Sequence, residues 1–213
     1  MQRVWRFLGR KPRLDGWLNR PFSPTVEVGP RANDRRDCFE RVVAVESAGE
    51  PEPGGPHRRV AQAIFAYRMF PETLVTPVLL RSPLDVGDTV GILYHFLPGL
   101  DLFCGARVVE CFDGAREGVW RTGFKYRALL GHPELGEETF SVEKEIATGQ
   151  VVAALRSWSR PGTWLTWLGA PYARRAQVHA NNSALCHLAA VATGAVNLPT
   201  DEPGGSSPGS GAA

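Results

Sequence analysis

The chain has 213 residues, of which 43% are hydrophobic and 22% are charged, as in an ordinary globular domain with tails. Its formal net charge of +2 argues against the broad basic surface of a nucleic-acid-binding protein. No apolar run approaches the roughly 20 residues that a membrane-spanning helix needs.

The two ends differ in composition from the middle of the chain. Residues 1–37 mix arginine, proline and tryptophan without a clear period, which predicts an irregular N-terminal arm. Residues 197–213 are mostly small residues and proline, which predicts a disordered tail. We therefore expect a single domain over residues 38–196. The basic residues among the first 13 leave a peripheral membrane contact open, although a solvated arm is the simpler interpretation.

The first part of the domain predicts a short strand, a loop and a helix. Residues 41–45 have the composition of a strand, and residues 48–56 (AGEPEPGGP) that of a loop. Apolar residues at helical spacing run from Val60 to Phe70 and predict a helix that stops at Pro71. A turn at residues 86–88 follows.

Alternating residues then predict an antiparallel meander between residues 89 and 159. The expected strands are 89–96, 104–112, 120–130, 138–145 and 151–159, with turns at Asp113-Gly114 and Thr148-Gly149. Such a sheet has one dry and one wet face, and His95 falls on the wet side. The expected strand 120–130 shows the clearest dry face, which is formed by Trp120, Thr122, Phe124, Tyr126 and Ala128.

Residues 171–192 predict a long helix that covers the dry face. Pro171 suits the first turn of a helix, and Gly194 suits a position just after its end. The sequence therefore predicts an α+β fold in which an antiparallel β-sheet is covered by a long C-terminal helix.

Cysteine spacing predicts free thiols. Cys38, Cys104, Cys111 and Cys186 form no C-x-x-C pair. The odd spacing of Cys104 and Cys111 on one expected strand places them on opposite faces. Free thiols are typical of a reducing compartment, so we expect a cytoplasmic protein.

A long motif follows the clearest strand. Residues 122–140 read TGFKYRALLGHPELGEETF and resemble the signature G-F-x-Y-x-T-L-x-G-H-P-E-x-G-E-E-x-F of the family called domain of unknown function nineteen-ninety. Residues 157–161 (SWSRP) resemble its S-R-P element, and residues 168–177 resemble the entry to its closing helix. The resemblance covers about residues 59–192. Ala128 departs from it, since the family usually has threonine there.

The resemblance implies a START-like helix-grip fold, in which a curved antiparallel sheet wraps around a long C-terminal helix. Proteins of that kind often hold apolar ligands between sheet and helix, and some are enzymes. The resemblance names no activity, and neither it nor the residues point to a cofactor.

The segment GHPELGEE (131–138) is expected to join two strands. As a purely structural element, its glycines and proline shape a wide turn, with His132 or Glu134 capping backbone N–H groups. Alternatively, these side chains contact a ligand or perform acid–base chemistry at the rim of the sheet. No pair of histidines has the spacing of metal ligands, so no metal site is predicted.

Glu138 is the unusual residue of this segment, because alternation places it on the dry face beside Phe140 and Val142. A buried carboxylate needs a partner, or its pKa rises. We expect a basic or hydroxyl partner, with Arg156 or Arg160 as candidates, unless Glu138 lies at the wet end of its strand.

Neighbouring expected strands carry the large rings of Trp120, Phe124, Tyr126 and Trp158. These rings either form the core or line an apolar pocket. Trp164 and Trp167, before the closing helix, either anchor that helix or contact a membrane or partner.

Three functions remain open: binding of a small apolar or amphipathic ligand between sheet and helix, a hydrolase-type or cyclase-type enzyme using His132, Glu134 and Glu138, or a protein-interaction or membrane-peripheral module. The first is favoured. The candidate ligand-binding residues are Trp120, Phe124, Tyr126, His132, Glu134, Glu138, Phe140, Trp158 and Arg160.

Overall fold

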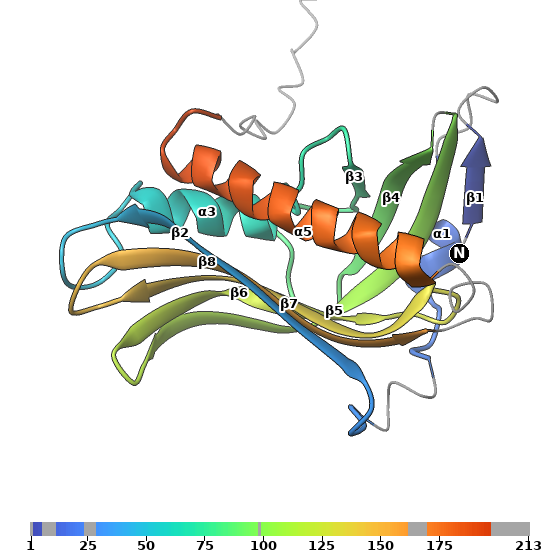
Figure 1. The fold of residues 1–213 in the computed structure, drawn as a ribbon, viewed down its shortest axis with the longest axis horizontal. Coiled ribbons are helices and arrows are strands. Elements are labelled where there is room, and N and C mark those ends of the chain that lie inside the picture. Colours follow the sequence, from blue (N-terminus) through green and yellow to red (C-terminus); the bar gives the residue numbers. More distant parts are fainter. Residues whose placement is uncertain (1, 6–11, 24–28, 98, 162–169, 197–213) are drawn as a thin grey trace, which may run out of the picture.

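The computed structural model describes residues 2–5, 12–23, 29–97, 99–161 and 170–196 (Figure 1). Its centre is one antiparallel sheet in which the strands follow the order β2-β8-β7-β6-β5-β4-β3, with β1 paired to β5. The strands are β1 (Gln2–Trp5), β2 (Arg35–Val45), β3 (Val75–Val78), β4 (Thr89–Leu97), β5 (Leu100–Arg116), β6 (Val119–Ala128), β7 (Glu134–Glu145) and β8 (Gln150–Pro161). The helices are α1 (Asp15–Leu18), α3 (Pro56–Phe65) and α5 (Ala170–Ala192).

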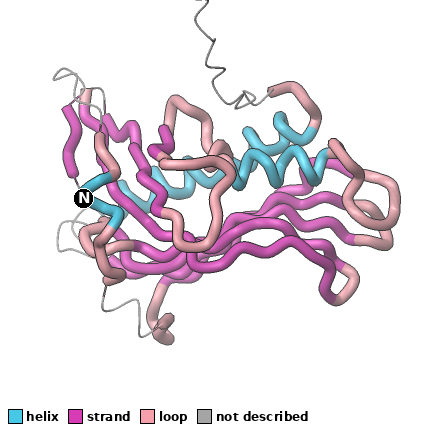
Figure 2. The backbone as a smooth tube through the Cα atoms, turned by 180° about the vertical axis from the view of Figure 1, so that it is seen from behind, coloured by secondary structure: helices cyan, strands magenta, loops and turns pink. Residues whose placement is uncertain are grey.

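The predicted architecture is confirmed: strands β4 to β8 form an antiparallel meander, and the long C-terminal helix α5 lies in the curve of the sheet (Figures 1 and 2). Two glycines permit close approach of neighbouring strands along this curve. A Cβ atom on Gly123 would lie 2.1 Å from the carbonyl oxygen of Phe140, and one on Gly136 would lie 2.0 Å from that of Trp158. Side chains at these positions would therefore push the strands apart.

The core lies between the inner face of the sheet and the helices α3 and α5. Phe124 and Phe140 are fully buried on adjacent strands, with ring centroids 5.4 Å apart. The ring of Tyr67 packs against both, at 6.3 and 5.9 Å. Thus α3 and the residues that follow it share the covering role that the sequence assigned to the C-terminal helix alone.

Several element boundaries differ from the predictions. Helix α3 ends at Phe65 rather than before Pro71, because Tyr67 adopts a left-handed conformation with φ of 52°. Strand β2 begins at Arg35. Strand β7 begins at Glu134, so half of the segment GHPELGEE belongs to a strand and only its first residues turn the chain.

Strand β5 contains a bulge that alternation did not reveal. Its register with β6 shifts between Val108 and Glu110, so the residues that follow change face. The prediction that Cys104 and Cys111 point to opposite faces is therefore wrong. The strand also passes through Asp113-Gly114, and the chain turns at Glu117 and Gly118, where φ is 54° and 79°.

The N-terminal region expected to be irregular contributes ordered elements. Strand β1 pairs with β5, and Trp17 of α1 is 2% exposed, with its ring edge-on to Phe103 at 6.1 Å. Residues 197–213 lie outside the described residues. All four cysteines are free. Within the described ranges, no helix is long and apolar enough to cross a membrane.

Candidate functional site

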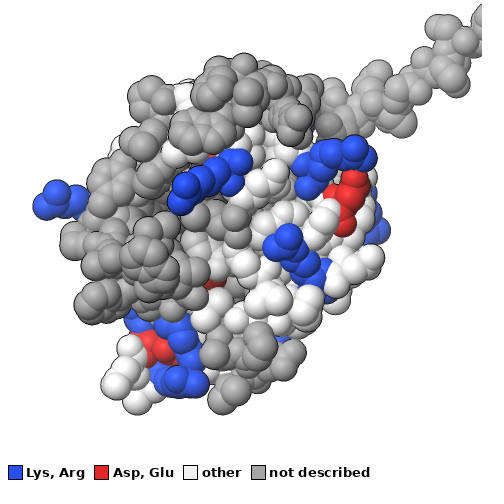
Figure 3. Space-filling model, turned by 90° about the vertical axis from the view of Figure 1, so that its right-hand side faces the viewer, with Lys and Arg blue, Asp and Glu red and all other residues white. Residues whose placement is uncertain are grey.

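A cavity of about 960 Å³ lies between the sheet and the N-terminal half of α5. Of the elements that line it, β1, β4 and the N-terminal end of α5 lie on the right-hand side of Figure 1. Figure 3 looks onto that side, where basic side chains are more frequent than acidic ones among the described residues. Two arginines that border the cavity, Arg3 of β1 and Arg175 of α5, are exposed. Its apolar wall includes Phe70, Leu74, Val75, Leu100 and Leu102.

Glu138 borders this cavity from the inner face of β7. The hydroxyl of Tyr126, its cross-strand neighbour on β6, donates a hydrogen bond to Glu138 Oε2 over 2.8 Å. Burial raises the pKa of Glu138 to about 7; the Tyr126 hydroxyl opposes the rise, and the negative charges of Glu134 and Asp37 add to it. Near neutral pH, Glu138 is therefore poised between its protonated and ionised forms.

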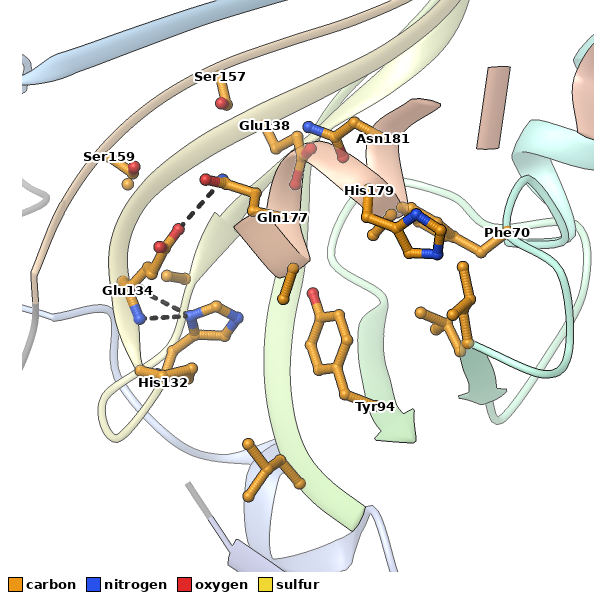
Figure 4. A pocket seen from close by; sticks show the side chains of 18 of the residues that line it. Phe70, Tyr94, His132, Glu134, Glu138, Ser157, Ser159, Gln177, His179 and Asn181 are labelled. Atoms are coloured by element: carbon orange, nitrogen blue, oxygen red, sulfur yellow. Dashed lines mark hydrogen bonds between the residues drawn. The ribbon is translucent and has the colours of Figure 1, made fainter. Parts of the chain in front are cut away.

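Two further polar groups extend toward the same part of the cavity (Figure 4). Asn181 of α5 is 4% exposed and, like Glu138, lines the cavity. The hydroxyl of Tyr94 points into the cavity from β4, and burial raises the pKa of this phenol far above its usual value. Neither side chain has a hydrogen-bond partner within the part of the chain that the structure describes.

The turn before β7 places an imidazole on the cavity wall. His132 Nδ1 lies 2.7 Å from the carbonyl oxygen of Glu134 and 3.2 Å from its amide nitrogen. We assign the proton to Nδ1, which then donates along the shorter contact, so that Nε2 is an acceptor. Burial lowers the pKa of His132 to about 4, so the ring is neutral, and Nε2 is buried without a partner in the described chain.

A polar network joins α5 to the sheet beside the cavity. Arg35 Nη2, which carries two N–H groups, lies within hydrogen-bond distance of Gln177 Oε1 at 2.7 Å, Ser159 Oγ at 3.0 Å and Glu134 Oε1 at 3.2 Å. Arg174 of α5 makes two hydrogen bonds of 2.7 Å to the carboxylate of Asp37. These contacts hold the N-terminal half of α5 across the edge of the sheet and thereby help to define the cavity.

Of the residues predicted to bind a ligand, Tyr126, His132, Glu134 and Glu138 lie together on the wall of one cavity. Phe124 and Phe140 are fully buried in the core behind it. Trp120 lies at the other end of β6, where its Nε1 donates to Asp113 Oδ1 at 2.7 Å.

Neither of the two arginines of β8 that were predicted as partners of Glu138 pairs with it. Arg160 does not pair with Glu138: it lies opposite Leu135, on the other face of the sheet, and forms an ion pair with Asp34. Arg156, the other candidate partner, pairs with Glu143 and Glu40. The expectation of a hydroxyl partner for Glu138 is confirmed by Tyr126.

The indole of Trp158 also belongs to the outer face. Trp158 borders the cavity, but its Nε1 donates to Glu137 Oε2 at 3.1 Å, and Glu137 pairs with Arg127 on that outer face. Trp158 therefore borders the cavity although its indole lies on the outer face, unlike the aromatic rings that line the cavity from the inner face.

Tyr94 and Asn181 were not among the residues predicted for the site, and the prediction for His95 was wrong. His95 was expected to be exposed, but its side chain is 18% exposed, and its ring nitrogens lie 3.0 Å from Asp101 Oδ1 and 2.9 Å from Thr76 Oγ1. Alternation did place Tyr94 on the dry face, so a buried phenol was a signal that could have been followed. Trp164 and Trp167, and any membrane contact through them, lie outside the described residues.

The described residues contain no group of three or more histidine, cysteine or acidic side chains arranged to hold a metal ion. The polar groups of the cavity are instead suited to hydrogen bonding and, through Glu138, to proton transfer.

Comparison with known proteins gives a family match. The model of the family described as "Domain of unknown function (DUF1990)" matches residues 27–186. A UPF0548 protein of Dictyostelium discoideum is 32% identical over 145 residues, which cover 65% of this chain and 58% of that protein. A UPF0548 protein of Arabidopsis thaliana is 37% identical over 99 residues, covering 46% of this chain and 48% of that protein. The chain thus spans about half the length of the curated relatives it matches.

Solved structures with a related arrangement are distant in sequence. Ara h 8.0201 aligns over 73% of this chain and 98% of its own, with 7% identity and a TM-score of 0.43. Norcoclaurine synthase from Thalictrum flavum, solved with dopamine and hydroxybenzaldehyde, aligns over 78% of this chain and 91% of its own, with 7% identity and a TM-score of 0.42. At these scores, the dopamine and hydroxybenzaldehyde of the synthase structure carry no argument about this cavity.

Proposed function

This chain belongs to the DUF1990 family, and we propose that it binds a small, largely apolar molecule between its sheet and α5. The observation that supports this proposal is the cavity of about 960 Å³, which has the size of a small-molecule site. Its wall combines aromatic and aliphatic side chains with a few polar groups that converge at one place, as binding sites for small ligands do.

Apolar burial would supply most of the affinity. Each Å² of apolar surface removed from water contributes about 25 cal/mol, before the loss of ligand freedom is subtracted. Phe70, Leu74 and Leu102 offer such surface, and the network around Arg35 holds the helix that closes it. The free cysteines favour a cytoplasmic location, and alkylation of the unfolded protein without reductant would test this by counting four thiols.

A titration with pyrene, followed by its fluorescence, tests the proposal. Ala180 lines the cavity from α5, whereas Asn182 is exposed on the same helix. We expect Ala180→Phe to fill part of the cavity and to lower pyrene affinity at least tenfold, while the matched control Asn182→Phe binds as the wild type does. Equal binding by both variants, or no binding by the folded wild type, would reject the cavity as a ligand site.

Acid–base catalysis is a second candidate, favoured by one observation: Glu138 has a pKa of about 7 in a largely apolar cavity. Glu138 would accept a proton from a bound substrate and return it. Incubating the molecule retained by the purified protein in D₂O, with wild type and with Glu138→Gln, tests this by mass spectrometry. Deuterium uptake at carbon should require Glu138, and its absence with the wild type would dismiss catalysis.

A further inference from the structure

We propose that the inner part of the cavity recognises an uncharged hydroxyl or carbonyl group of the ligand through Glu138, Asn181 and Tyr94. This inference rests on the proposed function and narrows the ligand to a neutral, largely apolar molecule with an oxygen-bearing end. The three side chains come from β7, α5 and β4, and Figure 4 shows them converging on one region of the cavity.

Each of the three side chains has unused hydrogen-bonding capacity. The Tyr126 hydroxyl satisfies Oε2 of Glu138, and the described residues provide no partner for Oε1. The Asn181 amide offers two N–H donors and one acceptor, yet no described residue bonds to it, although it is 4% exposed. The Tyr94 hydroxyl is likewise unpaired among the described side chains and faces the cavity.

Asn181 is buried, and Glu138 and Tyr94 are half-buried; polar groups in such positions cost free energy unless something satisfies them. In the absence of ligand, water in the cavity can do so. A ligand that fills the cavity displaces that water, and it binds well only if its own oxygen replaces the lost hydrogen bonds. The remaining wall around Phe70, Leu74 and Leu102 is apolar, so it favours a ligand whose remaining surface is apolar.

The charges around Glu138 favour a neutral group over an anion. The two acids that act on Glu138 most, Glu134 and Asp37, are themselves held by Arg35, and Asp37 also by Arg174. Among the described residues, no cation acts on Glu138 directly, so a second anion beside it would lack one, whereas protonated Glu138 offers both an O–H donor and an acceptor to a hydroxyl. The other titratable groups that border the cavity or act on Glu138's surroundings are Tyr67, Tyr126, His95, His132, Glu137, His179, Arg3 and Arg175.

A matched series of probes tests the inference: pyrene, 1-hydroxypyrene, 1-pyrenecarboxylate and 1-pyrenemethylamine, titrated by fluorescence at pH 6. We expect 1-hydroxypyrene to bind about five- to thirty-fold more tightly than pyrene, as one or two hydrogen bonds to buried groups would provide. The carboxylate should bind more weakly than the hydroxyl compound. Tightest binding by the amine would overturn the inference, because Glu138 would then act as a counter-ion.

Two variants locate the effect. Tyr94→Phe removes one hydroxyl and Asn181→Leu removes the amide, and each should reduce the advantage of 1-hydroxypyrene over pyrene at least fivefold. Asn182→Leu is the matched control on the exposed side of α5 and should leave that ratio unchanged. If Asn181→Leu fails to fold, Tyr94→Phe decides alone. An unchanged ratio in Tyr94→Phe and in a folded Asn181→Leu would overturn the inference.

The probe series also separates the two proposals. If pyrene binds, and Ala180→Phe weakens it, but the hydroxyl gives no advantage, the recognition of an oxygen group is rejected and the binding cavity stands. If none of the four probes binds to the folded wild type, the proposed function is rejected and the inference falls with it.

Discussion

Glu46 and Glu138 lie near opposite ends of β7, and their surroundings shift the pKa values of the two carboxyl groups in opposite directions. Glu46 is at the end far from the cavity, where Lys144 Nζ lies 2.8 Å from its Oε2 and the His57 amide donates to its Oε1 at 2.7 Å. Burial alone would raise the pKa of Glu46, but the hydrogen bonds from Lys144, His57 and Glu52 outweigh it and lower the pKa. Glu138 has only a phenol as its hydrogen-bond partner among the described residues, and its pKa rises.

The difference separates a structural charge from one available to a ligand. Lys144 and Glu46 have no exposed side-chain surface, so their pair is complete within the fold. Glu138 borders a cavity and keeps an oxygen without a partner in the described chain. A buried charge compensated by the protein stabilises one conformation, whereas an uncompensated group beside a cavity is typical of functional sites.

The largest expected effect on stability comes from breaking the buried pair of Lys144 and Glu46. Lys144→Met leaves Glu46 buried without its cation, and we expect it to lower the free energy of unfolding by about 3–5 kcal/mol. Urea denaturation at pH 7.5 measures this. The double variant Glu46→Gln/Lys144→Met should recover a substantial part of the loss. Lys125→Met is the control, because its 2.7 Å pair with Glu110 is partly exposed and should change stability by about 1 kcal/mol or less. A similar loss of stability in Lys144→Met and Lys125→Met would contradict the claim that the buried pair matters more to the fold than the partly exposed one.

The second-largest effect is expected for Glu138→Gln, which should gain stability where Lys144→Met loses it. A raised carboxyl pKa means that the folded state holds the proton more tightly than the unfolded chain does, so ionisation destabilises the fold as pH rises from about 4.5 to about 7. Glu138→Gln avoids that ionisation. Relative to wild type, it should therefore gain stability between pH 4.5 and pH 8, by at most about 3 kcal/mol, and by less since the cavity admits water. A pH-independent difference between the two proteins would show that Glu138 is not perturbed.

The smallest expected effect concerns His57, which lies beside the Glu46 pair and has no exposed surface. Burial lowers the pKa of His57 to about 4. The folded state therefore resists protonation, and the stability contributed by neutral His57 is lost as pH falls from about 6.5 toward 4. His57→Leu should gain up to about 2 kcal/mol relative to wild type between pH 7.5 and pH 5 in thermal or urea unfolding. A difference that stays constant with pH would mean that His57 titrates normally in the fold.

Strict alternation explains which parts of the fold were predictable. Strands β6 and β7 keep an unbroken period of two, so the inner-face positions of Phe124, Tyr126, Glu138 and Phe140 followed from the sequence. The bulge at Val109 was invisible because neither residue type nor spacing marks an extra residue in a strand.

The candidate site was only partly predictable because cavities depend on long-range packing. The turn from His132 to Glu134 was identified from its motif, but Tyr94 and Asn181 reach it from elements far apart in the sequence. Arg160 was misplaced for a simpler reason. The register of β7 and β8 sets it opposite Leu135, and a one-residue difference in pairing changes the face.

Native mass spectrometry of freshly purified protein tests the central claim, that the cavity beneath α5 holds a small molecule. The wild type should carry a non-covalent mass of one small, largely apolar compound, and that mass should be reduced or lost in Ala180→Phe but kept in Asn182→Phe. A wild-type protein that carries no such mass and takes up none of the pyrene probes would contradict the account, and so would a bound mass that Ala180→Phe leaves unchanged.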